Sequence, residues 1–162
     1  MFFLGDLPTA AMLDGYARRF ETMDAPAVAE ALGRLRWASL LMRDLEAYFA
    51  AHDLGQTQFL ILIVIDREPE RTSLAPSEIA ARLDVSRPIV SNATRRLVER
   101  GLLAPAGTPA APGRARPDAR VRPLALTTGG RARLDALLPG YFRLIGEHMA
   151  RPLPGPTVVQ GA

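Results

Sequence analysis

The feature that most constrains the fold is a pair of short helix-forming segments separated by a turn of three residues. The first segment, residues 74–83, has a proline and a glutamate where the first turn of a helix favours them. The second follows Ser86, a residue suited to a helix N-cap, and ends near Gly101. Two short helices joined so tightly predict a helix-turn-helix motif.

The second helix of this motif has two chemically different faces. On a helical wheel, one face is apolar and suited to burial: Val90, Ala93, Thr94 and Leu97. The opposite ridge carries Pro88, Ser91, Asn92, Arg95 and Glu99. Asparagine pairs well with adenine, arginine with guanine and serine with either, so the ridge suits the reading of base edges. A merely solvated helix face is the alternative.

Positive charge is concentrated in and after this helix. All 20 basic residues of the chain are arginine, and ten of them lie between Val85 and Arg133 against two acidic residues. That stretch therefore carries a net charge of +8, whereas the rest of the chain sums to −5. Such segregation is typical of a nucleic-acid-binding surface. Arginine enrichment from a GC-rich genome is the alternative, but it would not sort arginine from acid along the chain.

Composition excludes several other classes of protein. The chain has no cysteine, which excludes disulfides, thiol nucleophiles and thiolate metal sites. Its two histidines, His52 and His148, lie in no cluster of metal ligands and no nucleophile motif. No apolar run reaches the roughly 18 residues of a membrane helix. We therefore expect a cytoplasmic protein that is not an enzyme and that needs neither metal nor cofactor.

The remaining segments predict further helices and a proline-rich interruption. Helices are expected over residues 7–22, from about residue 26 to residue 52, and from Thr127 onward. Pro139-Gly140 should kink or interrupt the last of these. The seven consecutive apolar residues 59–65 fit a buried strand or a buried helix.

Residues 104–123 contain five prolines and two glycines, too many for a helix. We expect a loop or a hairpin there, with Leu124 to Leu126 as a short strand and Pro123 in the second strand of the hairpin. Residues 151–162 are also rich in proline, which predicts a disordered tail.

The order of these segments resembles the multiple-antibiotic-resistance regulator (MarR) family of winged-helix repressors. The resemblance runs from about Leu54 to Leu138. Its motifs are LDVSRPIVS at residues 83–91, LVERGLL at residues 97–103, and the wing Asp118-Ala119-Arg120 followed by LTTGGR at residues 126–131. The wing and the glycine-containing start of the next helix are the most specific parts.

The resemblance implies a mainly α fold with a small β-hairpin wing, in which a winged helix-turn-helix domain carries N- and C-terminal dimerisation helices. The ranges are 1–53 for the N-terminal helices, 54–126 for the DNA-binding domain, 127–150 for the C-terminal dimerisation helix and 151–162 for the tail. Residues 59–65 then become a buried helix. The resemblance also implies a homodimer that binds a palindromic operator in double-stranded DNA as a repressor.

The same resemblance assigns roles to individual residues. Ser86 would cap the recognition helix, and Arg120 would enter the minor groove from the wing, held by Asp118. A narrow minor groove concentrates negative potential, which suits arginine. The full set of predicted DNA-binding residues is Ser86, Arg87, Pro88, Ser91, Asn92, Arg95, Arg96, Arg114, Arg116, Asp118, Arg120 and Arg122.

A small-molecule effector is also implied by the resemblance, bound between the dimerisation helices and the DNA-binding lobes. Trp37, Met42 and Tyr48 could line a pocket for an aromatic effector, although aromatic residues on a core helix more often serve packing. The alternative function is a winged-helix protein-interaction module, a co-regulator or anti-repressor without its own operator. Loss of arginine from the recognition face and wing would favour it, and Arg95 and Arg120 are both present.

Overall fold

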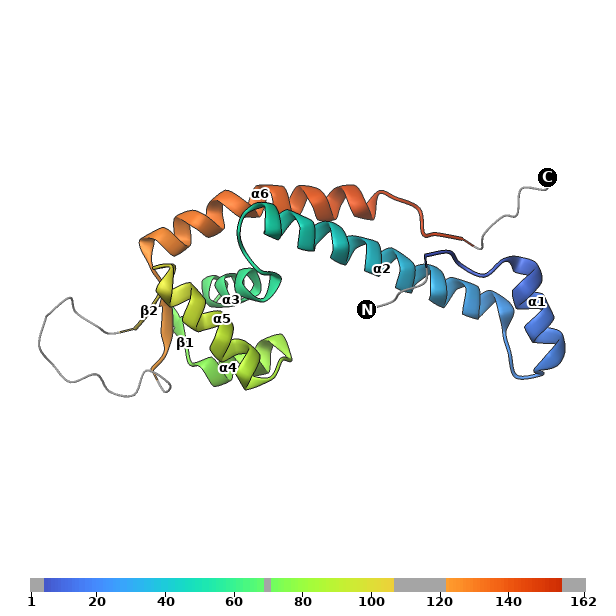
Figure 1. Ribbon diagram of the computed structural model, residues 1–162, viewed down its shortest axis with the longest axis horizontal. Helices are drawn as coiled ribbons and strands as arrows, with labels where there is room; N and C mark the ends of the chain where they lie inside the picture. Colours follow the sequence, from blue (N-terminus) through green and yellow to red (C-terminus); the bar gives the residue numbers. More distant parts are fainter. Residues whose placement is uncertain (1–4, 69–70, 107–121, 156–162) are drawn as a thin grey trace, which may run out of the picture. The chain divides into compact units, whose positions relative to one another are not determined.

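The computed structural model describes residues 5–68, 71–106 and 122–155 (Figure 1). The chain divides into two compact units: the 48–141 unit, and the terminal unit made of residues 1–47 and 142–162. Two long helices, α2 (Ala25–Ala51) and α6 (Thr128–Met149), contribute residues to both units. The helix-turn-helix segment falls entirely within the 48–141 unit.

Helix α3 (Gln56–Asp66) forms the centre of the 48–141 unit, so the seven apolar residues form a helix rather than a strand. It packs against α4 (Pro76–Leu83), α5 (Arg87–Glu99) and strand β3 (Leu124–Leu126). Its buried side chains include Phe59, Ile61 and Leu62, all fully covered. Because neighbours cover the helix on several sides, it is apolar around most of its circumference.

Helices α4 and α5 form the expected helix-turn-helix (Figure 1). Asp84, the C-cap of α4, takes the left-handed conformation with φ of 51°. The Val85 amide then donates to the Ala80 carbonyl at 3.1 Å, which reverses the chain before α5 begins. Ile79 of α4 and Val90 of α5 are both fully buried, so apolar packing holds the two helices in place.

A three-stranded antiparallel sheet completes this unit. Strands β1 (Ser73–Leu74) and β2 (Leu103–Pro105) both pair with β3, in the order β1-β3-β2. The prediction that the first helix of the motif begins at Leu74 is wrong, because Leu74 lies in β1, where it pairs with Leu124, and α4 begins at Pro76. Strands β2 and β3 form the base of the expected hairpin, and the residues that connect them, 107–121, lie outside the described residues.

The expectation that Pro123 lies within the second strand of the hairpin is wrong, because β3 begins at Leu124. Pro123 instead offers its carbonyl to the Ala106 amide at 2.8 Å. Pro105 is the last residue of β2, an edge strand of the sheet. Proline has no amide hydrogen to give to a strand ladder, so both prolines occupy places where none is required.

The chain enters α6 through a closely packed joint. The Thr127 hydroxyl caps the helix as expected, accepting from the Gly130 amide at 2.9 Å and donating to the Gly101 carbonyl at 2.7 Å. Gly101, with φ of 69°, follows the end of α5. A Cβ added to Gly130 would lie 2.0 Å from the Leu102 carbonyl oxygen. The glycine of the LTTGGR motif therefore lets the α6 backbone approach the end of α5.

Of the kink or interruption expected at Pro139, the interruption is not found, because α6 runs unbroken from Thr128 to Met149. Proline removes one helical hydrogen bond. Next to it, the Tyr48 hydroxyl of α2 donates to the Leu137 carbonyl at 2.8 Å. A Cβ on Gly140 would lie 2.4 Å from the same hydroxyl oxygen, so Gly140 makes room for the tyrosine ring. The helix continues through the proline with Tyr48 packed against it.

In the terminal unit, the first two helices begin at side-chain caps. Helix α1 covers Ala10–Arg19, fewer residues than the expected 7–22, because Thr9 Oγ1 accepts from the Met12 amide at 3.2 Å and starts the helix there. Asp24 Oδ1 accepts from the Ala27 amide at 3.0 Å and starts α2, which has nearly the predicted bounds.

The end of α6 packs on α2 through His148, which is buried. Its Nε2 donates to the Trp37 carbonyl at 3.1 Å, and its ring meets the Trp37 indole edge-on. Its Nδ1 lies 3.6 Å from an Asp44 carboxylate oxygen, to which Arg151 also pairs at 3.3 Å. The chain thus stays against α2 just beyond α6. Residues 156–162 of the predicted tail lie outside the described residues.

No single helix in the described part of the chain is long and apolar enough to cross a membrane. Helices α2 and α3 reach the length and apolar composition of a membrane-spanning segment only when the two are taken together across the break between them.

Candidate nucleic-acid interface

Helix α5 presents the two faces that its sequence predicts. Val90, Ala93, Thr94 and Leu97 are buried, and the Thr94 hydroxyl donates to the Val90 carbonyl at 2.8 Å. The predicted DNA-binding residues on the other side are all exposed: Arg87, Pro88, Ser91, Asn92, Arg95 and Arg96. The apolar face therefore fixes the helix to the core, and the polar face is available to a partner.

Ser86 occupies the N-cap position of α5, but its hydroxyl makes no capping hydrogen bond. Its carbonyl accepts from the amides of Ile89 at 3.1 Å and Val90 at 3.3 Å. The expectation that the Ser86 side chain caps the helix is therefore wrong, although the position is right. Pro88 compensates in part, because its fixed φ favours the first helical turn.

The exposed side chains of α5 line two hollows. The first, which we call the wing groove, has a volume of about 880 Å³ and lies between the start of α4, one side of α5 and strands β2 and β3. Arg87, Ser91 and Arg95 line it from α5, and Pro105 and Leu124 line it from the strands. The structure thus brings together serine and arginine groups that can read base edges.

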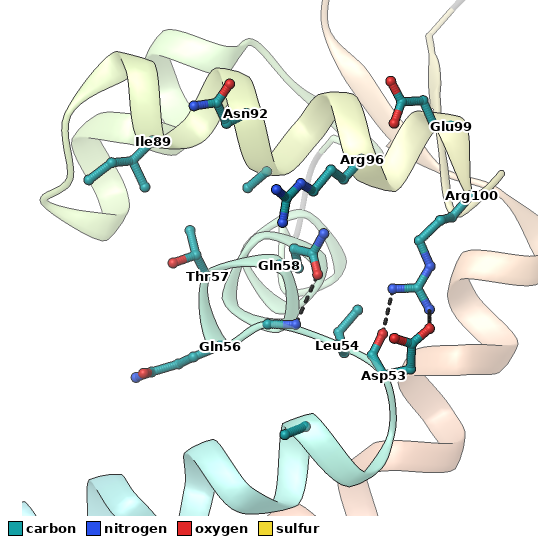
Figure 2. Close-up of a pocket in the computed structure, with 13 residues that line it drawn as sticks. Asp53, Leu54, Gln56, Thr57, Gln58, Ile89, Asn92, Arg96, Glu99 and Arg100 are labelled. Carbon is teal, nitrogen blue, oxygen red and sulfur yellow. Dashed lines mark hydrogen bonds and ion pairs between the residues drawn. The ribbon is translucent and has the colours of Figure 1, made fainter.

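The second hollow, which we call the turn hollow, has a volume of about 860 Å³ and lies between α5, the end of α2 and the start of α3 (Figure 2). Asn92 and Arg96 line it from α5, and Thr57 and Gln58 line it from α3. Figure 2 shows the Arg96 guanidinium directed into this hollow, and it makes no hydrogen bond or ion pair within the described ranges. The predicted ridge is therefore divided between two sides of the helix.

Arg95 is connected to both of its polar neighbours on α5. Its Nη2 donates to Asn92 Oδ1 at 2.9 Å, and its Nε lies 4.0 Å from Glu99 Oε1. All three side chains are exposed. Asn92, one turn before Arg95, and Glu99, one turn after it, thus flank the Arg95 guanidinium.

Three arginines of the basic stretch are used inside the unit instead of facing a partner. Arg100 pairs with the Asp53 carboxylate at 3.1 Å, Arg131 pairs with Asp66 at 2.5 Å, and Arg133 donates to the His52 carbonyl. Sequence reasoning missed these roles because the partners lie far away in the chain. The +8 charge is therefore partly neutralised by contacts within the fold.

Glu78 holds the start of α4, which forms a wall of the wing groove, and Glu78 is not among the predicted functional residues. The Glu78 carboxylate accepts from the Ala75 amide at 2.8 Å and from Arg71 Nη1 at 2.8 Å. The backbone hydrogen bond, followed by the bond to Arg71, lowers the pKa of Glu78. The signal for this role was the spacing of three residues between Ala75 and Glu78, which is that of a capping box.

The predicted wing residues are described only at the base of the hairpin. Arg122 is half-buried and lies just before Pro123. Arg114, Arg116, Asp118 and Arg120 fall outside the described residues.

The three residues suggested for effector binding line neither hollow. In the terminal unit, Trp37 packs on His148 and Met42 is exposed. In the 48–141 unit, Tyr48 packs against Phe49 and His52. Each aromatic ring thus has packing neighbours within its own unit.

Metal ligands are not brought together in the described part of the chain, where no group of three or more His, Cys, Asp or Glu side chains could hold an ion. His52 Nδ1 donates to the Tyr48 carbonyl at 2.8 Å, an ordinary contact within a helix end.

A tight helix-turn-helix with a polar recognition ridge, followed by a paired hairpin base, defines the winged-helix class of DNA-binding proteins. Residues 52–115 match the model of the MarR family. With the relatives described next, this match shows that the chain is similar to the MarR family of transcriptional regulators.

The chain resembles family members in sequence and in fold. The HTH-type transcriptional repressor YetL of Bacillus subtilis is 27% identical over 147 residues, which cover 90% of this chain and 83% of that repressor. The crystal structure of wild-type MarR from E. coli is 26% identical, with a TM-score of 0.57 over 73% of this chain and 82% of that one. Sco5413, a MarR family transcriptional regulator from Streptomyces coelicolor, shares the fold at 22% identity, with a TM-score of 0.62 over 80% of this chain and 84% of that one.

Proposed function

We propose that this chain is a repressor that binds a palindromic operator as a homodimer. The observation that carries the proposal is the exposed face of α5, where Ser91 and Arg95 line one groove beside the hairpin base. An arginine fork and a hydroxyl are groups that discriminate bases in the major groove. The similarity to a transcriptional repressor over most of the chain supports repression as the mode of regulation.

The arginines divide into base readers and phosphate binders in this proposal. Arg95 with Ser91 reads base edges, and Arg87 and Arg96, which line the wing groove and the turn hollow respectively, bind the phosphate backbone. In the wing, Arg120, held by Asp118, reads the minor groove, while Arg114, Arg116 and Arg122 contact phosphates.

The proposed homodimer is supported by exposed apolar side chains in the terminal unit. Tyr16 of α1 and Phe20, which caps the end of α1, are each about half exposed, and Phe142 and Met149 of α6 are more than half exposed. Tyr16 and Phe20 stack on each other, which makes a continuous aromatic surface on a short helix. A two-fold dimer would cover such surfaces and would match the symmetry of a palindrome.

The proposed effector is a small organic anion of the aromatic-acid class. The turn hollow supports it, because it has the size of a ligand pocket and Arg96 directs a guanidinium into it (Figure 2). Trp37, Met42 and Tyr48 are the other candidates, and a ligand there would have to displace the packing of Trp37 and Tyr48.

A salt titration of binding to a specific and a scrambled duplex tests the proposed function. Arg95→Ala should cost roughly 1–3 kcal/mol on the specific duplex and relax the preference at one position of each half-site. Arg120→Ala should weaken binding to narrow-groove flanks most. Replacing Arg114 and Arg116 together should lower affinity for both duplexes alike and reduce the salt slope by up to about two. If Arg95→Ala and Arg120→Ala leave the ratio of specific to scrambled affinity unchanged, the protein-interaction alternative is the better one.

A further inference from the structure

We propose that Asn92 and Glu99 are positioning residues that hold the Arg95 guanidinium for base reading, and that they connect the turn hollow to that reading. The proposal rests on the proposed function, because it concerns the side chain assigned there to the major groove. It adds a role for two residues and a route by which a molecule in the turn hollow changes DNA recognition.

The two contacts of Arg95 leave one edge of its guanidinium open. The Nε edge lies toward Glu99, at 4.0 Å, and one Nη2 hydrogen is donated to Asn92 at 2.9 Å. A guanidinium has five N–H donors in a fixed plane. The Nη1 hydrogens and the second Nη2 hydrogen therefore remain for an end-on fork, the arrangement that pairs with the O6 and N7 atoms of guanine.

The same contacts change what Asn92 can do. Asparagine recognises adenine with its amide oxygen and nitrogen together. In this structure the Asn92 oxygen accepts from Arg95, so bidentate pairing with adenine competes with the contact that orients Arg95. We therefore assign Asn92 to the positioning of Arg95 rather than to a base of its own.

The turn hollow shares these positioning residues. Asn92 and Glu99 line the turn hollow, whereas Arg95 lines the wing groove together with Glu99. A molecule in the turn hollow can thus contact both residues that flank Arg95 without occupying the wing groove. The coupling needs no movement of one unit against another, since all three side chains belong to α5.

The free energy that these contacts contribute depends on how far they are exposed to water. The Arg95 and Glu99 side chains are 65% and 64% exposed, and such pairs contribute little to the stability of a free protein. At a DNA interface water is excluded, and the same contacts become stronger. The positioning role should therefore alter DNA discrimination while leaving the melting temperature almost unchanged.

The first test is a double-mutant cycle on the ratio of specific to scrambled affinity, using the duplex that the wild-type protein enriches from random sequence. Asn92→Ala should lower the ratio about threefold to tenfold, the effect of one hydrogen bond. Asn92→Asp, which keeps the acceptor oxygen, should retain most of it. In an Arg95→Ala background, Asn92→Ala should add nothing. Additive losses, or a preference lost at a base other than the one read by Arg95, would show that Asn92 reads DNA independently and would overturn the proposal.

The second test fills the turn hollow covalently, which is possible because the chain has no cysteine of its own. Thr57→Cys, on the α3 wall of the hollow, is alkylated with N-ethylmaleimide, and Ala136→Cys, an exposed position on α6, is the matched control. Alkylation at residue 57 should change the ratio at least threefold, and much less when Asn92→Ala and Glu99→Gln are both present. Alkylation at residue 136 should change nothing.

The outcomes separate this proposal from the function on which it rests. If the wild-type protein binds both duplexes equally, the proposed function fails and this inference fails with it. If the wild type discriminates but alkylation at residue 57 has no effect, or has the same effect with and without Asn92 and Glu99, this inference alone is overturned. Melting curves of the alkylated protein check that the fold is intact.

Discussion

The two units of the chain differ in how far their large apolar side chains are buried. In the 48–141 unit most large apolar side chains are inside: Phe59, Leu97 and Leu134 are completely buried, and Ile89 and Val98 of α5 are exposed. In the terminal unit Tyr16, Phe20 and Phe142 remain 50%, 48% and 60% exposed. The first unit thus has a covered apolar core and exposes mainly polar groups. The second unit exposes apolar surface of the kind that a partner covers.

This difference suggests a division of labour within one short chain. In the proposed function, the 48–141 unit uses its polar surface for recognition, while its apolar core is covered within the unit. The terminal unit has short or partly exposed helices that gain from association. Changes in the two units should therefore affect different properties, and the following predictions test that separation.

The largest effect is expected in the core of the 48–141 unit. Phe59 is fully buried and stacks on Phe49, with ring centroids 4.5 Å apart. Phe59→Ala should lower the free energy of unfolding by about 3–5 kcal/mol, because it removes an aromatic side chain and leaves a cavity. Denaturant unfolding measures this. Met12→Ala, at an exposed position of α1, is the control and should change little; equal losses would contradict the separation.

A second effect should distinguish the two ends of α6. A Cβ at Gly130 would lie 2.0 Å from the Leu102 carbonyl oxygen, whereas a Cβ at Gly146 would meet nothing within 4 Å. Gly130→Ala should destabilise the protein by roughly 1–3 kcal/mol. Gly146→Ala should stabilise it by about 0.5–1 kcal/mol, since alanine favours the helix. Thermal unfolding of both variants checks the opposite signs, and the same sign for both would refute the contact at Gly130.

A third change should act on association alone. Replacing Tyr16 and Phe20 with serine removes the exposed aromatic surface of α1, and should weaken the proposed dimer about tenfold or more, or about 1.4 kcal/mol. Removal of residues 1–22 should have at least the same effect. Light scattering over a dilution series should show the wild type at about twice the chain mass. An unchanged dissociation midpoint would exclude α1 from the interface.

The smallest effect concerns the start of α4 and its dependence on pH. The hydrogen bond from the Ala75 amide and the contact with Arg71 hold the pKa of Glu78 below its ordinary value. A carboxyl whose pKa is lowered by folding stabilises the fold above its unfolded pKa, and this contribution disappears as the pH falls through the folded value. Glu78→Gln should therefore make the acid side of the stability profile shallower. Urea unfolding from neutral to acid pH measures it, and identical profiles would contradict the role of Glu78.

The sequence was most informative where local chemistry decides the structure. The faces of α5, the Thr127 cap and the helix-turn-helix followed from spacing and residue type, because each depends on residues within one or two turns. The interruption expected at Pro139 did not occur, and the contacts around this proline come from distant positions in the chain. Tyr48, which packs there, is 89 positions from Leu137, and its hydroxyl could not be foreseen from the local pattern.

The candidate site shows the same limit. A helical wheel placed Ser91, Asn92 and Arg95 on one ridge, and it could not show that Asn92 and Arg95 face different hollows. Nor could the charge count distinguish Arg95, which is open to a partner, from Arg100, which is held by Asp53. Both distinctions depend on segments brought beside α5 by the fold. The composition of the ridge was thus predictable, but the partners of its side chains were not.

Selection from random duplex DNA shows whether α5 reads a DNA sequence with Arg95. The purified wild-type protein should enrich a palindrome with two equivalent half-sites. Arg95→Ala should enrich the same palindrome with the preference lost at one position of each half-site, since only one base contact is removed. Enrichment of no sequence by the wild-type protein, or an identical base preference in the two proteins, would contradict the account.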